Sequence, residues 1–260
     1  LVVRNLEQWQ DMKFGLFMHW GTYSQWGIVE SWSLCPEDES WTQRKPEHGK
    51  SYYEYVKNYE NLQTTFNPTQ FNPQKWADAV KKAGMKYVVF TTKHHDGFAL
   101  WPSKEATRDW GFPWNAKEAG PHRDLLGDLF AAVRKTSVHP GMYFSLYEWY
   151  NPLWKKDHAE YANKHMWPQM LDLVNNYKPD VFWTDGEWDE SDTLWQSTKF
   201  LAWLYNESPV KNSVVTFDRW GRGVRFKHGQ VFTPEYQPEL DFADHYFEEN
   251  RGMGFSYGYN

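Results

Sequence analysis

Two carboxylates lie beside short apolar segments, where they could act as nucleophile, base or acid. Asp185 follows the apolar run 181–184 and precedes a glycine; there it could attack or accept a proton, although aspartate before glycine is also a common turn. Glu235 follows a proline among aromatic residues, and apolar surroundings favour a protonated, proton-donating carboxyl; an exposed glutamate is the alternative. Glycoside hydrolysis requires such a pair. Glu187 and Asp189 are expected to be solvated or to lie behind the site.

Three histidines end apolar runs and could bind a metal ion or a polar substrate. His94 and His95 are adjacent, so both could reach one ion only if the backbone bends out of its strand. The chain has one cysteine, no H-x-H and no H-E-x-x-H, so we favour hydrogen bonds to a polar substrate and expect no metal. His19 has the same use, and burial as a structural histidine is the alternative for it and for one of the pair.

Aromatic residues make up 19% of the chain, and flat rings stack on sugar faces as well as they fill a core. Most tryptophans, among them Trp32 and Trp183, are expected in the core or at the rim of a site, and one or two that face it would form a sugar platform or a wall for an apolar substituent. Arg219 follows a weak apolar run. It could hold hydroxyls or a carboxylate, or pair with Asp218 at the surface.

The elements that must position these residues alternate between strands and helices. Apolar spacing predicts helices over 73–83, 126–133 and 158–177, the first capped by Asn72 and the last kinked at Pro168. The expected strands are 14–19, 87–92, 141–146 and 181–184, with weaker candidates at 214–217, 230–233 and 254–257.

This alternation predicts a mainly parallel sheet in a single α/β domain over residues 1–260. The polar residues cluster after the strands, at their carboxyl ends, as in a (β/α)8-like, TIM-type barrel. An open doubly wound sheet would also bind ligands there, but no strand is followed by a glycine-rich phosphate loop. The sequence therefore favours the barrel.

Composition excludes several classes of protein. The 28 Lys and Arg against 34 Asp and Glu give a net charge of −6, which argues against a broadly basic nucleic-acid binder. No apolar run approaches the roughly 20 residues of a membrane helix, and no signal peptide is recognisable. The single Cys35 excludes an intrachain disulfide framework. A leader removed before residue 1 would leave secretion open.

Six ordered blocks, spread over nearly the whole chain, resemble the α-L-fucosidases of glycoside hydrolase family 29. These blocks are KFGLFMHWG at 13–21, KYVVFTTKHHDGF at 86–98, RDLLGD at 123–128, SLYEW at 145–149, WTDG at 183–186 and GFSYGYN at 254–260. The resemblance implies a retaining exo-glycosidase that needs no cofactor and removes terminal α-linked L-fucose from fucosylated oligosaccharides or polysaccharides.

By this resemblance Asp185 is the nucleophile, and Glu235, in a Thr-x-Glu-Tyr stretch after Asp-Arg-Trp-Gly, is the acid/base. The other implied sugar contacts are His19, His94, His95, Arg219, Glu30 or its neighbour Trp32, Trp183, and the pocket walls Tyr143 and Tyr257. Fucose lacks a 6-hydroxyl, so donors and acceptors on one side and rings around its methyl group suit it.

Family members continue beyond the last block into a closing strand and usually a β-sandwich domain. We therefore expect a barrel without its final strand and the C-terminal β-sandwich, in a fragment of a longer chain. The resemblance implies a secreted, periplasmic or lysosomal enzyme. A non-catalytic fucose-binding module and a metal-dependent barrel hydrolase are the alternatives, and the oligomeric state is left open.

Overall fold

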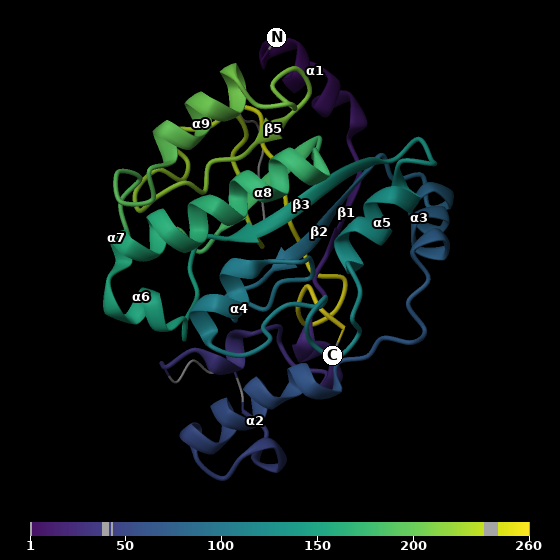
Figure 1. Ribbon diagram of the computed structural model, residues 1–260. Helices are drawn as coiled ribbons and strands as arrows, with labels where there is room; N and C mark the ends of the chain where they lie inside the picture. Colours follow the sequence, from purple (N-terminus) through teal and green to yellow (C-terminus); the bar gives the residue numbers. More distant parts are fainter. Residues whose placement is uncertain (1, 38–41, 43, 237–243, 260) are drawn as a thin grey trace.

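The fold is a five-stranded parallel sheet with helices between successive strands. The computed structural model describes residues 2–37, 42, 44–236 and 244–259, and its strands pair in sequence order (Figure 1). The strands are β1 (Gly15–Met18), β2 (Tyr87–Lys93), β3 (His139–Ser145), β4 (Val181–Asp185) and β5 (Val215–Thr216). The predicted parallel α/β sheet is confirmed, and all four pairings are parallel.

The helices follow the order that the sequence predicted, with several more than expected. They are α1 (Val2–Met12), α2 (Tyr52–Thr65), α3 (Pro73–Lys82), α4 (Lys104–Trp110), α5 (Leu125–Val133), α6 (Pro152–Lys156), α7 (His158–Tyr161), α8 (Trp167–Tyr177) and α9 (Ser197–Asn206). Asn72 caps α3 as expected, because its side chain accepts a hydrogen bond from the Lys75 backbone N–H at 3.0 Å. Asp124 caps α5 in the same way.

The long helix predicted over 158–177 is divided into three parts. A π-helical turn, Ala162–Met166, separates α7 from α8. Pro168 lies in the first turn of α8, where a missing N–H leaves no hydrogen bond unmade. The helix is therefore interrupted over Ala162–Met166, before the proline, instead of at Pro168 itself.

Two of the weaker strand predictions are wrong. The segment 214–217 contributes β5, but 230–233 forms only a single bridge, from Phe232 to Phe247, and 254–257 consists of bends. The stretch 232–235 lies against 247–250 through isolated bridges instead of a continuous ladder. In the described part of the chain, no helix is long and apolar enough to cross a membrane.

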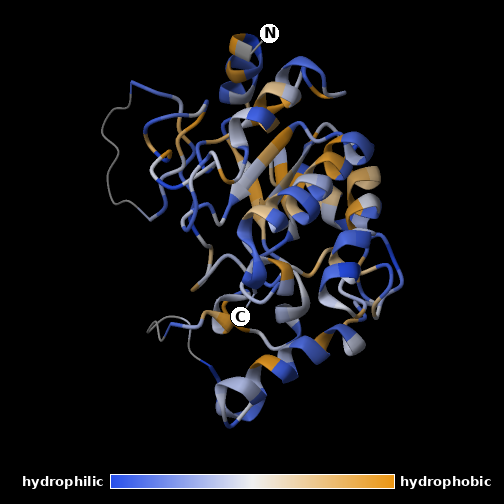
Figure 2. Ribbon diagram, turned by 60° about the vertical axis from the view of Figure 1, so that its left-hand side comes forward, coloured by the Kyte–Doolittle hydropathy of each residue, from blue (hydrophilic) through white to orange (hydrophobic). Residues whose placement is uncertain are grey.

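Alternation along the buried strands separates two apolar layers. Val88 and Phe90 face the helices in the larger cluster, whereas Tyr87 and Val89 face the other side, where α1 adds Trp9. Figure 2 shows hydrophobic residues concentrated in these central strands. This second layer, rich in rings, leads directly to the carboxyl ends of the strands.

Candidate active site

A pocket of about 550 Å³ lies at the carboxyl ends of the strands. Residues singled out from the sequence line it: His19, Glu30, Trp32, His94, Tyr143, Trp183, Asp185, Arg219, Glu235 and Tyr257. His95 is not in the lining, but its Nε2 lies 3.7 Å from Asp185 Oδ2. The structure thus brings together side chains from the ends of the strands and from the segments that follow them.

Asp185 is the last residue of β4, and cationic and hydrogen-bonding groups surround its carboxylate. Arg219 Nη1 donates to Oδ1 at 3.0 Å, and the Tyr143 hydroxyl donates to Oδ2 at 2.8 Å. Burial opposes ionisation, but Arg219, His95 and the Tyr143 hydrogen bond outweigh it and lower the pKa of Asp185. Asp185 is therefore an ionised carboxylate at the pocket wall.

Arg219 is held rigidly and contacts both candidate carboxylates. Its Nε donates to Thr233 Oγ1 at 2.8 Å, its Nη2 lies 3.1 Å from Glu235 Oε2, and the guanidinium lies over the Trp183 ring. The alternative of a surface arginine paired with Asp218 is wrong, because Arg219 is 1% exposed. One buried guanidinium therefore links Asp185 to Glu235.

Glu235 is partly exposed, with 29% of its side chain accessible. Its surroundings are not the apolar ones expected from the sequence, because Glu235 Oε2 lies near both Arg219 and Arg225, the latter at 3.6 Å. The reason is that the segment before Glu235 folds back over Arg219, with the Thr233 hydroxyl and carbonyl as acceptors. Glu235 thus combines access to solvent with two cationic neighbours.

The backbone of β2 changes its pairing just before the two adjacent histidines. Its register against β3 shifts between Thr91 and Lys93, and the strand ends at Lys93, so His94 and His95 lie where the chain turns and strand alternation no longer separates them. Burial, with the neighbouring histidines, lowers the pKa of His94 well below its usual value. Burial also lowers the pKa of His95 to about 4, although Asp185 opposes that shift.

The hydrogen bonds of His95 define its tautomer. Ser145 Oγ donates its single hydrogen to the Tyr147 carbonyl at 2.6 Å, and it lies 2.7 Å from His95 Nδ1. Nδ1 must therefore carry the proton and donate it to Ser145. In the neutral ring, the buried Nε2 has no hydrogen-bond partner among the described atoms and is an acceptor next to Asp185. It can receive a hydrogen bond from a substrate hydroxyl.

The other two histidines are equally suited to hydroxyl groups. His94 Nδ1 lies 2.5 Å from Ser31 Oγ, and His19 Nδ1 is buried with no hydrogen-bond partner in the described part of the chain. Burial lowers the pKa of His19 to about 3. A neutral imidazole offers one donor and one acceptor, so these rings can bind an uncharged polyol.

The remaining wall of the pocket brings together a segment near the start of the chain and one near its end. Glu30 is buried in a left-handed backbone conformation, with φ of 33°, and accepts a short hydrogen bond from the Gly258 N–H. This contact places Tyr257, whose hydroxyl has no partner in the described structure, against the ring of His19. Trp32 lies against the ring of His95.

Glu187 was expected to be solvated or to lie behind the site, and the first of these alternatives is wrong. It is 3% exposed, and one of its oxygens has no hydrogen-bond partner in the described structure. Burial first, and the charge of Asp185 second, raise the pKa of Glu187 to about 7. Its spacing of two residues from Asp185 was the available indication. Ser31, Ser145 and Arg225 were also missed.

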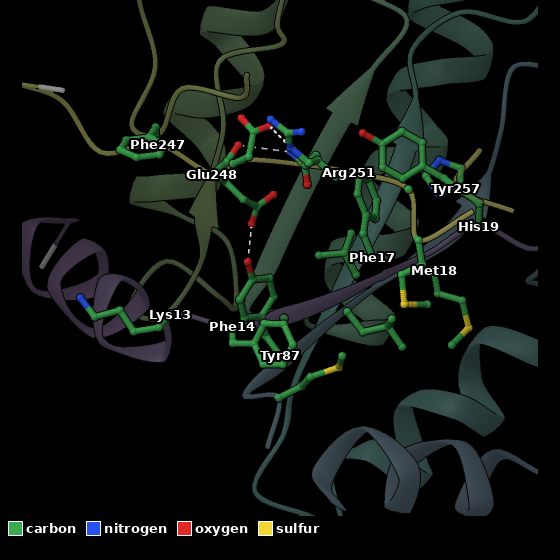
Figure 3. A pocket seen from close by; sticks show the side chains of 18 of the residues that line it. Lys13, Phe14, Phe17, Met18, His19, Tyr87, Phe247, Glu248, Arg251 and Tyr257 are labelled. Atoms are coloured by element: carbon green, nitrogen blue, oxygen red, sulfur yellow. Dashed lines mark hydrogen bonds and ion pairs between the residues drawn. The ribbon is translucent and has the colours of Figure 1, made fainter. Parts of the chain in front are cut away.

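Another unpredicted carboxyl group lies beneath the pocket. A larger groove of about 1950 Å³ runs along β1 and shares Phe17, His19 and Tyr257 with the candidate site (Figure 3). In it the Tyr87 hydroxyl and Trp183 Nε1 donate to Glu248 at 2.6 and 3.0 Å. Glu248 therefore fixes the Trp183 ring that carries Arg219.

The histidines do not belong to a metal-binding cluster in the part of the chain that the structure describes. Among the described residues, no three His, Cys, Asp or Glu side chains form a group that could hold a metal ion. The Nδ1 atoms of His94 and His95 contact serine hydroxyls instead.

In this pocket, beyond the carboxyl ends of the parallel strands, an arginine joins two carboxyl groups among neutral histidines and aromatic walls, which are residue types that glycoside hydrolysis needs. The family model for alpha-L-fucosidase matches residues 1–260. The chain belongs to the alpha-L-fucosidase family, glycoside hydrolase family 29.

Individual relatives support this assignment. The chain is 43% identical to rat tissue alpha-L-fucosidase over 261 residues, covering 94% of this chain and 54% of the rat protein. It is 40% identical to the human tissue enzyme over 273 residues, covering 98% of this chain and 56% of the human protein. The Thermotoga maritima alpha-fucosidase solved with a mechanism-based inhibitor aligns with a TM-score of 0.75 at 34% identity, over 96% of this chain and 59% of that one. The chain thus spans about half the length of the curated relatives.

Proposed function

We propose that this chain is the catalytic domain of a retaining alpha-L-fucosidase that hydrolyses terminal α-linked L-fucose from fucosylated oligosaccharides or polysaccharides. The observation that carries the proposal is the contact of one buried guanidinium, Arg219, with both Asp185 and Glu235 in one pocket. Family membership supplies the substrate class. The Thermotoga relative was solved in complex with a mechanism-based inhibitor, which supports a covalent intermediate.

In the proposed first step, Asp185 attacks the anomeric carbon while Glu235 donates its proton to the glycosidic oxygen, and the aglycone leaves. The electron pair of the broken bond stays with that oxygen. In the second step, Glu235 removes a proton from water, the water oxygen attacks the same carbon, and the ester bond to Asp185 breaks. Two inversions leave the configuration unchanged. Arg219 keeps Asp185 ionised before the attack and stabilises it as it leaves.

Substrate recognition is assigned to the neutral rings around these carboxylates. His95 Nε2 accepts from one sugar hydroxyl, and His19 and His94 bind others. Tyr143, Trp183 and Tyr257 form apolar walls, which suit the C6 methyl group of fucose. Glu30 and Trp32 complete the pocket beside them.

We further propose that the sheet is the larger part of a (β/α)8-like barrel, and that residues 1–260 belong to one catalytic domain. The parallel strands in sequence order and the helices between them support this. The family resemblance favours a secreted, periplasmic or lysosomal location.

The test is hydrolysis of an aryl α-L-fucoside by the protein and by its Asp185→Ala variant, with and without azide. We expect the variant to lose activity and azide to restore it with β-fucosyl azide as product. Fucose binding without turnover by the unmodified protein would favour the binding-module alternative. Loss of activity with a chelator, restored by added metal, would favour the metal-dependent alternative.

A further inference from the structure

The residues on either side of the two adjacent histidines converge on a buried carboxylate outside the pocket. Odd-numbered residues of β2, such as Tyr87 and Val89, face the inner layer of the sheet, and even-numbered ones face the helices. Lys93 breaks this alternation, because its ammonium lies 4.4 Å from the ring centroid of Phe144 on the helix side. The register shift after Thr91 causes this reversal.

On the helix side, Lys93 forms a fully buried ion pair with Glu148. Neither side chain has any exposed surface, and Lys93 Nζ also donates to Gln169 Oε1 of α8 at 2.9 Å. Glu148 follows β3, so this pair joins the carboxyl ends of two neighbouring strands. A buried charge without its partner is strongly destabilising, so Lys93 is fixed where the bulge places it.

The carboxylate of Glu148 has further donors that determine its orientation. His165 Nε2 lies 2.7 Å from one oxygen, and Asn151 Nδ2 and Trp110 Nε1 donate to the other at 2.8 and 3.2 Å. Burial opposes ionisation of Glu148, but His165 and Lys93 outweigh it and hold its pKa below the usual range. The carboxylate is thus an ionised, fully partnered group without freedom to rotate.

Glu148 also contacts the turn that follows the histidines. Gly97 has φ of 76°, and a Cβ atom there would collide with Glu148 Oε2. The next residue after Glu148 donates its backbone N–H to the His95 carbonyl at 2.9 Å. Lys93 precedes the two histidines and Gly97 follows them, and both the Lys93 side chain and the Gly97 backbone lie against Glu148. Glu148 therefore fixes the segment that carries His94 and His95 at both of its ends.

We propose that the Lys93–Glu148 ion pair positions His94 and His95 for the hydroxyl groups of fucose, an inference that rests on the proposed function. Neither residue lines the pocket, so both act through the histidines as positioning residues. Their loss moves the hydroxyl-binding nitrogens and leaves Asp185, on β4, in place. Sugar affinity is therefore expected to fall more than the rate of the chemical step.

The test compares the Lys93→Met/Glu148→Gln double variant with Val133→Ala. The double variant removes both charges together, which avoids an unpaired buried ion, and the introduced glutamine keeps an amide oxygen for His165. Val133, at the end of α5, is buried in the helix-side core and serves as a destabilised control. The measurements are the Kd for L-fucose by tryptophan fluorescence, the Tm, and kcat and KM on an aryl fucoside.

We expect the double variant to bind L-fucose at least tenfold more weakly with a smaller change in kcat, and Val133→Ala to lower Tm with unchanged fucose affinity. Unchanged fucose affinity in a folded double variant would overturn the inference. If the unmodified protein neither binds fucose nor cleaves the fucoside, the proposed function itself fails. If the double variant does not fold, Gly97→Ala, which displaces the turn from Glu148, must show the same loss of affinity or the inference is wrong.

Discussion

Replacing Glu187 by glutamine is expected to change how the stability of this protein depends on pH. Glu187 is buried beside Asp185, and burial first and the Asp185 charge second raise its pKa to about 7 from a reference value of 4.5. In the unfolded chain it ionises near that reference value. Between pH 4.5 and 7 the folded protein therefore binds a proton at Glu187 that the unfolded chain has lost.

The size of the effect follows from that difference. The difference between the reference value of 4.5 and about 7 corresponds to about 3 kcal/mol, an upper limit because Asp185 and Glu187 titrate together. Since the unfolded state binds fewer protons in this window, the free energy of unfolding falls as the pH rises from 4.5 to 7 and then levels off. Glutamine has no proton to lose, so its contribution is independent of pH.

The assay is urea unfolding of the wild type and Glu187→Gln at about pH 5 and about pH 8, on either side of the Glu187 transition, with Glu207→Gln as a control because Glu207 is exposed. Relative to the wild type, Glu187→Gln should become more stable at the higher pH than at the lower one, by as much as about 3 kcal/mol. Glu207→Gln should follow the wild type at both values. Equal differences at the two values for Glu187→Gln would refute a buried, protonated Glu187.

Three further predictions test other contacts. Ser145→Ala removes the acceptor that keeps the proton on His95 Nδ1. KM for a fucoside should therefore rise about tenfold, the equivalent of one hydrogen bond, with little change in kcat in steady-state kinetics. Tyr257→Ala should lower kcat/KM by about tenfold through the lost apolar wall, whereas Tyr257→Phe, which keeps the ring, should retain it. Glu248→Leu leaves the donors on Tyr87 and Trp183 buried and unpaired, so urea denaturation should show a loss of about 1–3 kcal/mol.

The central strands could be predicted because their sequences are apolar with little interruption. β2 and β4 are buried along their whole length, and such runs between turns are typical of parallel strands covered on both faces. The segments 230–233 and 254–257 have similar composition but make only single bridges or bends. Composition does not reveal whether a partner strand lies alongside a segment. The presence of such a partner is what separates β2 and β4 from the segments 230–233 and 254–257.

The histidine pair shows where sequence patterns stop being informative. Period-two alternation would place His94 and His95 on opposite faces, but β2 ends at Lys93 and both histidines follow it where the chain turns, with their ring centroids 4.1 Å apart. The position of this turn is tied to Glu148, which pairs with Lys93 across 55 residues of sequence. Glu30 likewise contacts Gly258 across 228 residues. Such long-range contacts leave no periodic trace in one sequence.

The charges around the pocket account for both the expected substrate and the expected pH dependence. Asp185 and Glu235 face the two guanidinium groups of Arg219 and Arg225, so each carboxyl group of the pair has a fixed positive charge beside it. An uncharged sugar enters this balance without needing a counter-charge, and neutral imidazoles suit its hydroxyls. Ionisation of Glu187 above about pH 7 adds a further negative charge beside Asp185, which no described cation offsets in a direct ion pair. A catalytic pocket arranged in this way should therefore work best where Glu187 keeps its proton.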